Sequence, residues 1–332
     1  MRRELIFQAL DCQPVSRVPV GFWFHFLPDV LTDDWRENPR LLEQNVAGHQ
    51  EFIKAFKPAL VKIMSDGFFF YPSPGVFQPI DLPMITAIDS DHKWLQAQVT
   101  LIRRVRSCQE DATYFYNIFS PLTSLRFKLG LERLKYFCEA QPEALGKTLS
   151  RMADGLAHLA RAAVTDGGAD GIYLSVQNPD LNFFSYDFYA QYAAPGEKDI
   201  LKAAQSAGGR NILHICGYAG VKNRLPFYAD YPFDAVNWAV NVEDIPLEKG
   251  RTIFPQKTLI GGFPNTPGSV LTDGSKEEIK AKARDLIRKA GPLGLILGAD
   301  CTVPSDVPLA NLDYVREAAQ EAIRFGGSGV QL

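Results

Sequence analysis

Short apolar runs, rich in β-branched and aromatic residues, alternate along the chain with longer stretches in which apolar residues recur at helical spacing. Such alternation predicts a parallel sheet covered by helices, and eight repeats predict that the sheet closes into a (β/α)8 TIM barrel. We expect a single barrel domain over residues 1–332, because no repeat or linker marks a boundary. The eight predicted strands are Arg17–Trp23, Ala59–Met64, Thr113–Phe119, Gly171–Val176, Asn211–Ile215, Asp234–Ala239, Lys257–Gly261 and Leu293–Gly298.

The helical stretches lie between these runs. The first residues of the chain predict a short amphipathic helix rather than a secretory signal, because they contain no long apolar run and no small-residue cleavage site. Ser275, followed by Glu278, predicts a capping box at the start of a later helix. The clearest helices are expected at Arg40–Phe56, Pro142–Asp166, Ser275–Ala290 and Leu309–Phe325.

Two segments, Phe68–His92 and Asn178–Tyr192, are rich in aromatic residues and show no helical period. Each follows a predicted strand. The loops after strands form the active-site mouth of a barrel, so one interpretation is that these long loops at the C-terminal face are lids or substrate walls. The other is that they are packed insertions.

The amino-acid composition of the chain argues against some classes of binding partner and location. Lys and Arg number 35 against 38 Asp and Glu, a net charge of −3, which argues against electrostatic binding of nucleic acid or anionic membrane. No segment approaches the ~20 apolar residues of a membrane span. The five cysteines are odd in number and scattered, so we expect reduced thiols and a cytoplasmic protein.

Polar residues gather where the predicted strands end, while the strand bodies are apolar. This polarity step is typical of the catalytic face of a barrel. The predicted strand ends are Phe22–His25, Ser65–Asp66, Ser120, Gln177–Asn178, His214–Cys216, Asn237–Trp238, Gly262–Phe263 and Asp300–Cys301.

The most specific candidate is His214 with Cys216, together with Cys301. Positions two apart in an extended strand point to the same side, so His214 and Cys216 can face one point in the barrel mouth. One imidazole and two thiolates suit zinc, and three protein ligands would leave a position open for a substrate. The alternative is that the cysteines are buried thiols that act as small hydrophobes.

Three other residues are candidates for a functional role, and for each of them the sequence leaves an alternative open. Asp66 is a candidate acid or hydrogen-bond acceptor, or else a turn residue before Gly67. His25 could orient a substrate or could simply be packed. Lys62 could serve as a Schiff-base lysine, but its orientation in the strand is undecided.

At these residues the chain resembles the uroporphyrinogen decarboxylase superfamily, and within it the zinc-dependent methylcobamide:thiol (coenzyme M-type) methyltransferases. The resemblance covers nearly the whole chain and is most specific in the His-x-Cys and downstream Cys pattern. The matching segments are Pro14–Val20, Ser65–Asp66, Phe119–Thr123, Asp166–Leu174, Leu213–Gly217, Asn237–Trp238, Ile260–Gly262 and Leu297–Leu312.

The resemblance implies a (β/α)8 barrel that transfers a methyl group between a corrinoid (methylcobalamin) carried by a transient partner protein and a small thiol or methylated substrate. It implies that His214, Cys216 and Cys301 hold Zn²⁺. A displaceable fourth ligand would come from Gln177 or Asp300.

The resemblance also assigns residues to the pocket. It implies that Asp66, Asn237 and Trp238 shape the pocket. We take Asp66 and Gln177 as candidate catalytic residues and His25, Asn237 and Trp238 as candidate substrate contacts. It leaves the direction of transfer open, and we expect a monomer or homodimer.

The decarboxylase branch fits less well. Its members carry arginines after the first strand that bind substrate carboxylates, whereas Gly21–Pro28 has no arginine here. A histidine near its last strand is also absent, because Gly298–Asp300 stands in that place. A metal-free decarboxylase acting on a tetrapyrrole or another carboxylate is therefore the second hypothesis, and a non-catalytic zinc- or corrinoid-binding accessory protein is the third.

Overall fold

Eight parallel strands form the centre of the protein. The computed structural model describes residues 2–73, 82–177, 184–217 and 220–326. The strands pair in the order β1-β8-β7-β6-β5-β4-β3-β2, so the two ends of the series are β1 and β2. The strands are β1 (Val20–Gly21), β2 (Leu60–Ile63), β3 (Thr113–Phe119), β4 (Gly171–Val176), β5 (Arg210–Ile215), β6 (Ala235–Trp238), β7 (Thr258–Phe263) and β8 (Leu295–Ala299).

The two ends of the sheet meet and nearly close the barrel. β1 and β2 lie next to each other, and a side chain at Gly21 would come within 3.5 Å of Leu60. β1 is shorter than predicted because Pro19 has no N–H to donate; its carbonyl oxygen accepts from Leu297 N at 2.9 Å, and the paired residues begin at Val20. The predicted (β/α)8 barrel is confirmed.

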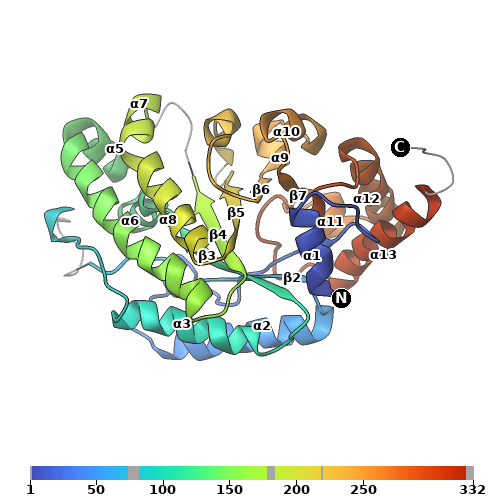
Figure 1. Ribbon diagram of the computed structural model, residues 1–332, viewed down its shortest axis with the longest axis horizontal. Helices are drawn as coiled ribbons and strands as arrows, with labels where there is room; N and C mark the ends of the chain where they lie inside the picture. The colour runs from blue at the N-terminus through green and yellow to red at the C-terminus, as the bar shows by residue number, and fades with distance from the viewer. Residues whose placement is uncertain (1, 74–81, 178–183, 218–219, 327–332) are drawn as a thin grey trace.

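Helices form a ring around the strands, as Figure 1 shows. The four helices predicted above are present, and both hydrogen bonds of the capping box at Ser275 are formed. The helices at Lys93–Arg106, Pro121–Leu129 and Leu131–Ala140 were not among those predicted. The longer helices are α1 (Arg2–Leu10), α2 (Arg40–Phe56), α3 (Lys93–Arg106), α4 (Pro121–Leu129), α5 (Leu131–Ala140), α6 (Pro142–Thr165), α8 (Ala194–Ser206), α10 (Leu247–Ile253), α12 (Lys276–Ala290) and α13 (Leu309–Gly326).

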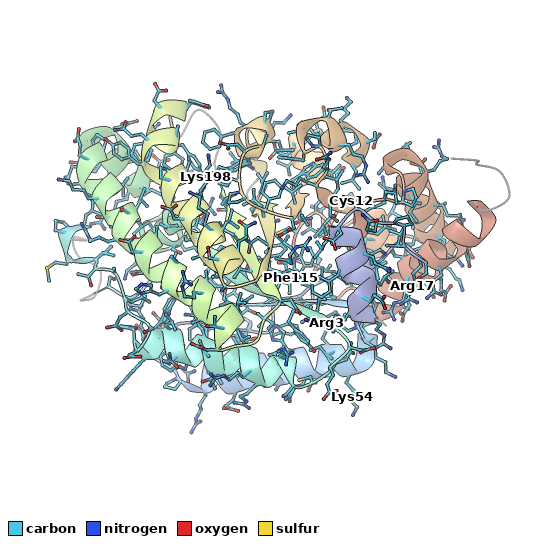
Figure 2. The ribbon with its side chains drawn as sticks, in the orientation of Figure 1. Arg3, Cys12, Arg17, Lys54, Phe115 and Lys198 are labelled. Carbon is cyan, nitrogen blue, oxygen red and sulfur yellow. The ribbon has the colours of Figure 1, made fainter. Side chains whose placement is uncertain are left out.

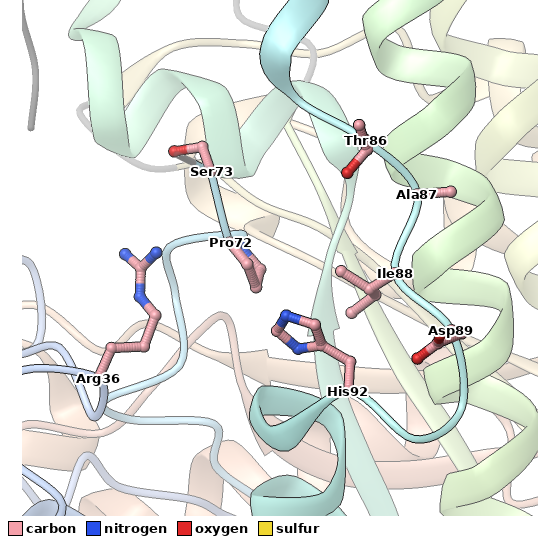
Figure 3. Close-up of a pocket in the computed structure, with 8 residues that line it drawn as sticks. All are labelled: Arg36, Pro72, Ser73, Thr86, Ala87, Ile88, Asp89 and His92. Carbon is pink, nitrogen blue, oxygen red and sulfur yellow. The ribbon is translucent and has the colours of Figure 1, made fainter. Parts of the chain in front are cut away.

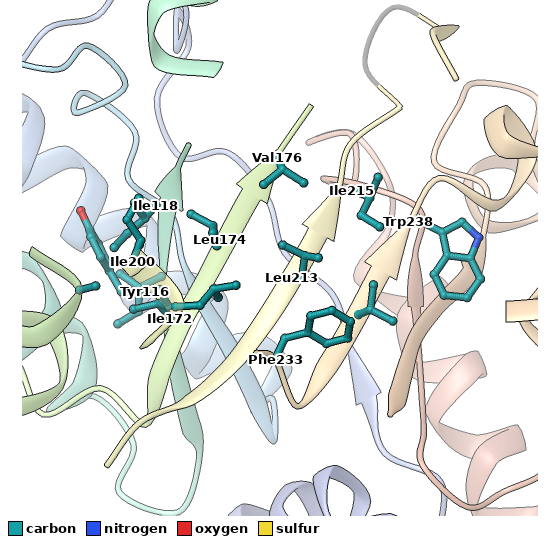
Figure 4. Packing of buried hydrophobic residues seen from close by; sticks show 14 of the residues in the cluster. Tyr116, Ile118, Ile172, Leu174, Val176, Ile200, Leu213, Ile215, Phe233 and Trp238 are labelled. Carbon is teal, nitrogen blue, oxygen red and sulfur yellow. The ribbon is translucent and has the colours of Figure 1, made fainter. Parts of the chain in front are cut away.

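Alternate residues of each strand face the helices or the barrel interior. The outward residues, such as Leu174 and Leu213, form a continuous apolar layer against the helices (Figure 4). A second, smaller apolar cluster includes Tyr173 and Ile212, together with Ile6 of α1. Because α1 contributes to that inner cluster, it covers the end of the barrel at which the strands begin.

α1 is also tied to the strands by charge. Arg3 forms an ion pair with Asp170, the residue before β4, and Asp170 accepts in addition from Tyr114 N at 2.8 Å. Arg3 and the interior residue Phe115 are both labelled in Figure 2. This arrangement closes one end of the barrel and leaves the carboxyl ends of the strands for a site.

Along the inner face, the side chains change from apolar to polar toward the carboxyl ends. On β3 the change is from Phe115 to Asn117, and on β5 it is from Ile212 to His214. Asn117 is not isolated, because its Nδ2 donates to Ser65 Oγ at 2.8 Å and its Oδ1 accepts from Ser175 at 3.1 Å. The expected polarity step at the strand ends is therefore present.

The second aromatic segment differs from its prediction. Its described part is helical, with α7 (Tyr186–Phe188) followed by a wider turn, η2 (Tyr189–Ala193). Ser185 caps α7 by accepting from Phe188 N at 3.1 Å. The first segment contains a short 3₁₀ turn, η1 (Leu82–Met84). Residues 74–81 and 178–183, which include the predicted strand end at 178, lie outside the described residues.

A buried carboxylate anchors this helical segment. Glu197 of α8 accepts hydrogen bonds from the Tyr189 and Tyr231 hydroxyls, each at 2.8 Å, and Ser120 adds a further bond. Glu197 is fully buried, and burial raises its pKa to about 7 in spite of these donors.

The raised pKa of Glu197 predicts a pH-dependent stability. A carboxyl that binds its proton more tightly in the folded state stabilises the fold fully below its ordinary pKa of 4.5, and that contribution is lost as pH rises through about 7. The contribution amounts to about 3 kcal/mol at most. Chemical denaturation between pH 4.5 and 8 should show that Glu197→Gln removes this loss of unfolding free energy.

The exposed Glu277→Gln is the matched control and should keep the wild-type pH dependence. A Glu197→Gln protein whose unfolding free energy still falls by the wild-type amount over this range would contradict the assignment.

Candidate metal centre

The three predicted metal ligands converge at the carboxyl ends of the strands. His214 lies near the end of β5, Cys216 follows that strand, and Cys301 lies two residues beyond β8. One ligand atom from each lies within 4.8 Å of the other two, and His214 Nε2 is 3.5 Å from Cys301 Sγ. The structure therefore brings together donors from strands that are not neighbours in the sheet.

Asn237 on β6, which lies between β5 and β7, fixes the imidazole. Its Oδ1 is 2.5 Å from His214 Nδ1 and also accepts from the Tyr173 hydroxyl at 2.9 Å. Its Nδ2 donates to the carbonyl oxygens of Ile260 and Ala299 at 2.9 and 3.1 Å. With both amide hydrogens used, the oxygen faces the histidine, so Nδ1 carries a proton and Nε2 is the nitrogen that faces Cys301.

This amide position depends on a glycine in β7. Gly261 has φ +135°, a conformation that side-chain-bearing residues rarely adopt, and a Cβ there would lie 3.2 Å from Asn237 Nδ2. The absence of a side chain at Gly261 lets the amide lie across β7 and reach Ala299 on β8.

The two thiols differ from the other cysteines in their surroundings. Cys216 and Cys301 are half-buried and line a cavity of about 560 Å³. A hydrogen bond from Cys216 is the main cause that holds the pKa of Cys301 well below its ordinary value; His214 and Lys62 add to it, and burial opposes it. A thiolate is the form that binds a metal.

The donor set fits zinc. One imidazole nitrogen and two cysteine sulfurs are a ligand set of catalytic zinc sites with three protein ligands. The histidine also has the outer-shell hydrogen bond that metal-ligating histidines require. Among the described residues, the other cysteines, Cys12, Cys108 and Cys138, do not join this group.

The two residues considered for a fourth ligand are buried. Asp300 is not part of the 4.8 Å group; its Oδ2 accepts from Asn241, and its Oδ1 has no hydrogen-bond partner in the described part of the chain. Burial raises the pKa of Asp300 to about 7. Gln177 lies directly after β4, and its buried Oε1 is likewise without a partner among the described residues.

His25 and Asp66 form a pair. His25 Nδ1 lies 2.8 Å from Asp66 Oδ1, and Asp66 Oδ2 accepts from Phe26 N at 2.7 Å. Asp66 is fully buried, whereas the His25 side chain is 35% exposed. The exposed part of His25 is available to a ligand, and Asp66 is not a simple turn residue.

Trp238 is not brought to the cluster. It lies on the outer face of β6, where its indole N–H donates to Ile245 O at 2.8 Å and its ring packs near Phe254 (Figure 4). The alternation of a strand explains this placement, because Asn237 faces inward and its neighbour must face the helices. The predicted contact of Trp238 with substrate therefore has no support in its position.

Lys62 points into the barrel, which resolves the orientation left open above. Its ammonium lies 4.0 Å from the centre of the Tyr173 ring, and the Tyr173 ring centre is 5.4 Å from that of His214. Burial lowers the pKa of Lys62 to about 8. Tyr173 was not among the predicted site residues, although alternation with Gln177 on β4 places it on the inner face.

A second cavity, of about 370 Å³, lies at the first aromatic segment (Figure 3). It is lined by Arg36, Pro72 and Ser73 on one side and by residues 86–89 and His92 on the other. It shares no lining residue with the cavity at the cysteines. Phe68–Tyr71 are buried, so this part of the segment is packed against the barrel.

Comparison with known proteins defines the family. A family model described as uroporphyrinogen decarboxylase (URO-D) matches residues 71–322, which is more than half of the chain. The chain belongs to the uroporphyrinogen decarboxylase family.

Relatives in this family include two kinds of enzyme. The uroporphyrinogen decarboxylase of Trichodesmium erythraeum is 28% identical over 187 residues, which are 56% of this chain and 49% of that protein. The methylcobamide:CoM methyltransferase MtbA of Methanosarcina mazei is 30% identical over 158 residues, which are 48% of this chain and 44% of that protein. The chain spans about half the length of the curated relatives it matches.

Solved structures agree on the fold. A methyltransferase from Methanosarcina mazei has a TM-score of 0.72 at 18% identity, covering 96% of this chain and 98% of that one. A B12-independent methionine synthase from Shewanella sp. W3-18-1 has a TM-score of 0.62 at 13% identity, covering 93% and 98%. At these identities the similarity establishes the barrel.

Within the described residues, no helix combines the length and apolar character needed to cross a membrane.

Asn237 provides a test of the outer-shell contact. Asn237→Ala removes the acceptor that holds the His214 tautomer, so zinc affinity should fall by roughly 10- to 100-fold. Asn237→Asp keeps an acceptor at that position and should retain more of the affinity. Competition with a chromophoric chelator measures both.

Asn311→Ala is the matched control, because Asn311 is a buried asparagine that donates to two backbone carbonyls away from the cysteines. A folded Asn237→Ala protein with wild-type zinc affinity would show that the contact does not orient the ligand.

Proposed function

We propose that the protein is a zinc-dependent methyltransferase of a corrinoid-linked system. It moves a methyl group between a methylated corrinoid protein, a transient partner, and a thiol or another small acceptor. The observation that carries this proposal is the convergence of His214 Nε2 with the sulfurs of Cys216 and Cys301 within 4.8 Å. The similarity to MtbA of Methanosarcina mazei, a methylcobamide:CoM methyltransferase, supports it.

The chain's own residues prepare the site for a thiol. His214, Cys216 and Cys301 would hold zinc, and the 560 Å³ cavity beside the two cysteines gives a small molecule access to them. Bound zinc would supply a Lewis acid that lowers the pKa of a coordinated thiol and so makes a nucleophile at neutral pH. The hydrogen bond from His214 to Asn237 holds the imidazole with Nε2 toward Cys301.

The proposed transfer conserves atoms and charge. The thiol proton goes to solvent, and the sulfur forms a bond to the methyl carbon while the cobalt–carbon bond of the partner's corrinoid breaks. The bonding electron pair stays on cobalt. The reverse direction, from a methylated substrate to the corrinoid, uses the same residues.

Asp66 and Gln177 remain the proposed catalytic residues, and His25 remains a proposed substrate contact. The exposed part of His25, held by Asp66, offers an imidazole N–H or lone pair to a substrate. We assign Asn237 to positioning the ligand, because its side chain hydrogen-bonds His214 and the backbone. A cytoplasmic location and a monomeric or homodimeric state remain predictions.

Uroporphyrinogen decarboxylation is the second candidate, because the relative from Trichodesmium erythraeum is a uroporphyrinogen decarboxylase and Asp66 is buried and hydrogen-bonded. Two observations weigh against it. Gly21–Pro28 has no arginine for substrate carboxylates, and Phe22 and Phe24 of that stretch are buried instead.

Metal analysis and a transfer assay test the proposal together. The purified protein should contain about one zinc per chain. Cys216→Ser and Cys301→Ser should each lose the zinc and lower methyl transfer from methylcobalamin to a thiol by at least about 100-fold, since each removes a ligand. Cys108→Ser, a half-buried thiol outside the cluster, is the control and should behave as wild type.

The alternatives give different results. A zinc-free wild-type protein that decarboxylates uroporphyrinogen would support the second candidate. A protein that holds zinc but releases no proton when a thiol is added would support the accessory-protein hypothesis, because an open site deprotonates the thiol that it binds.

A further inference from the structure

Lys62 is a buried cation that the proposed chemistry has not used. It is only 4% exposed and lies on β2, which is separated from β8 by β1 and from β5 by β3 and β4. No hydrogen bond or ion pair to its Nζ is found in the described part of the chain. A buried ammonium without a direct anionic partner is costly, so its presence calls for a compensating interaction.

Two aromatic rings hold the ammonium in place. Nζ lies 4.0 Å from the centre of the Tyr173 ring and 5.3 Å from that of Trp23. Cation–π contacts of this kind stabilise a desolvated cation without neutralising it. Tyr173 is itself fixed by its hydrogen bond to Asn237, so the ammonium and the ligand histidine share one rigid support.

The charges that face Lys62 belong to the metal centre and to Asp66. Cys301, Cys216 and Asp66 all interact electrostatically with its ammonium. Both Asp66 oxygens are already engaged, one with His25 and one with Phe26 N. The two sulfurs contribute more than Asp66 to the electrostatic interaction with Lys62, so they are the larger negative charge that it faces.

We propose that Lys62 is the counter-cation of the centre and selects the thiolate form of the substrate over its methylated product. This inference rests on the proposed function. Zn²⁺ with two thiolates and a neutral imidazole has no net charge, so a third thiolate makes the centre negative by one, whereas a thioether leaves it neutral. The positive charge of Lys62 acts through the low-dielectric barrel interior and stabilises the negative centre that holds a thiolate. It does not stabilise the neutral centre that holds a thioether.

An effect on thiolate binding but not on thioether binding distinguishes the counter-cation role of Lys62 from two other roles that a buried lysine can have. A Schiff-base lysine must reach a carbonyl substrate, and the covered position of Lys62 between two rings does not provide that access. A purely structural lysine would support the fold and would affect thiolate and thioether binding equally.

The experiment measures binding, not turnover. The full-length protein is loaded with Co²⁺ in place of zinc, and 2-mercaptoethanol or its methyl thioether is added across a range of pH. Sulfur-to-cobalt charge-transfer absorption reports the bound thiolate, and ligand-field bands report the thioether. The variants are Lys62→Met, which removes the charge, and Lys62→Arg, which keeps it; Lys54→Met on α2, labelled in Figure 2, is the surface control.

Lys62→Met should bind about one Co²⁺ per chain but should shift the pH midpoint of thiol binding upward by about one unit, a roughly tenfold loss of affinity at neutral pH. Thioether affinity should stay within about twofold of wild type, because no charge is added to the centre. Lys62→Arg should recover most of the shift, and Lys54→Met should show none. If Lys62→Met does not fold, Lys62→Gln carries the same expectation.

The results separate the two proposals. A wild-type protein that takes up no metal contradicts both. A folded, metal-loaded Lys62→Met protein with an unchanged thiol midpoint, or with equal losses for thiol and thioether, overturns the role of Lys62 and leaves the methyltransferase proposal standing.

Discussion

The hydrogen-bond set of one amide determines the rest of this centre. Asn237 uses both of its hydrogens on backbone carbonyls of β7 and β8, so its oxygen is left to accept from His214 and Tyr173. The same contacts that hold three strands in register thus decide which imidazole nitrogen is free. Reversing the amide would place N–H groups against donors and would leave buried carbonyls unpaired. The orientation of the His214 ring is therefore a consequence of barrel closure, and it turns Nε2 toward the sulfur of Cys301.

The barrel also explains how charged side chains can lie at the site although the barrel interior beneath them is apolar. Below the site, the inner face is filled with apolar residues and is covered by α1. Further along β3 and β4 the inward side chains become polar, and they hydrogen-bond one another across neighbouring strands. The change takes only two residues because side chains alternate with a period of two. Lys62 and the two thiols interact electrostatically next to this apolar layer, where a low dielectric strengthens interactions between charges.

The positions of the helices and strands could be predicted from the sequence more fully than the contacts between side chains. Strands at Thr113–Phe119 and Gly171–Val176 could be located to the residue because each is a buried apolar run between polar boundaries. The candidate metal ligands could be grouped from the sequence because His214 and Cys216 share a strand side and a resemblance supplies Cys301, and the structure brings the three together. The function of Asn237 could not, because its partners lie on β7 and β8 and depend on register and strand tilt. Trp238 was misplaced for a simpler reason: a residue adjacent to an inward one must face outward. The helical character of residues 186–193 was hidden by aromatic side chains whose spacing follows a wider turn than that of an α-helix.

The residues of the centre come from different strands of the barrel. All three ligand residues and the amide that orients them lie on β5, β6 and β8, whereas the buried ammonium and the ring beneath it lie on β2 and β4. The proposed metal ligands and the groups proposed to respond to the charge of the bound molecule thus belong to different strands of one barrel. In this proposal, substitutions on β2 and β4 change which molecules are accepted while the coordinating atoms stay intact, so a shared set of ligand residues would not guarantee a shared substrate.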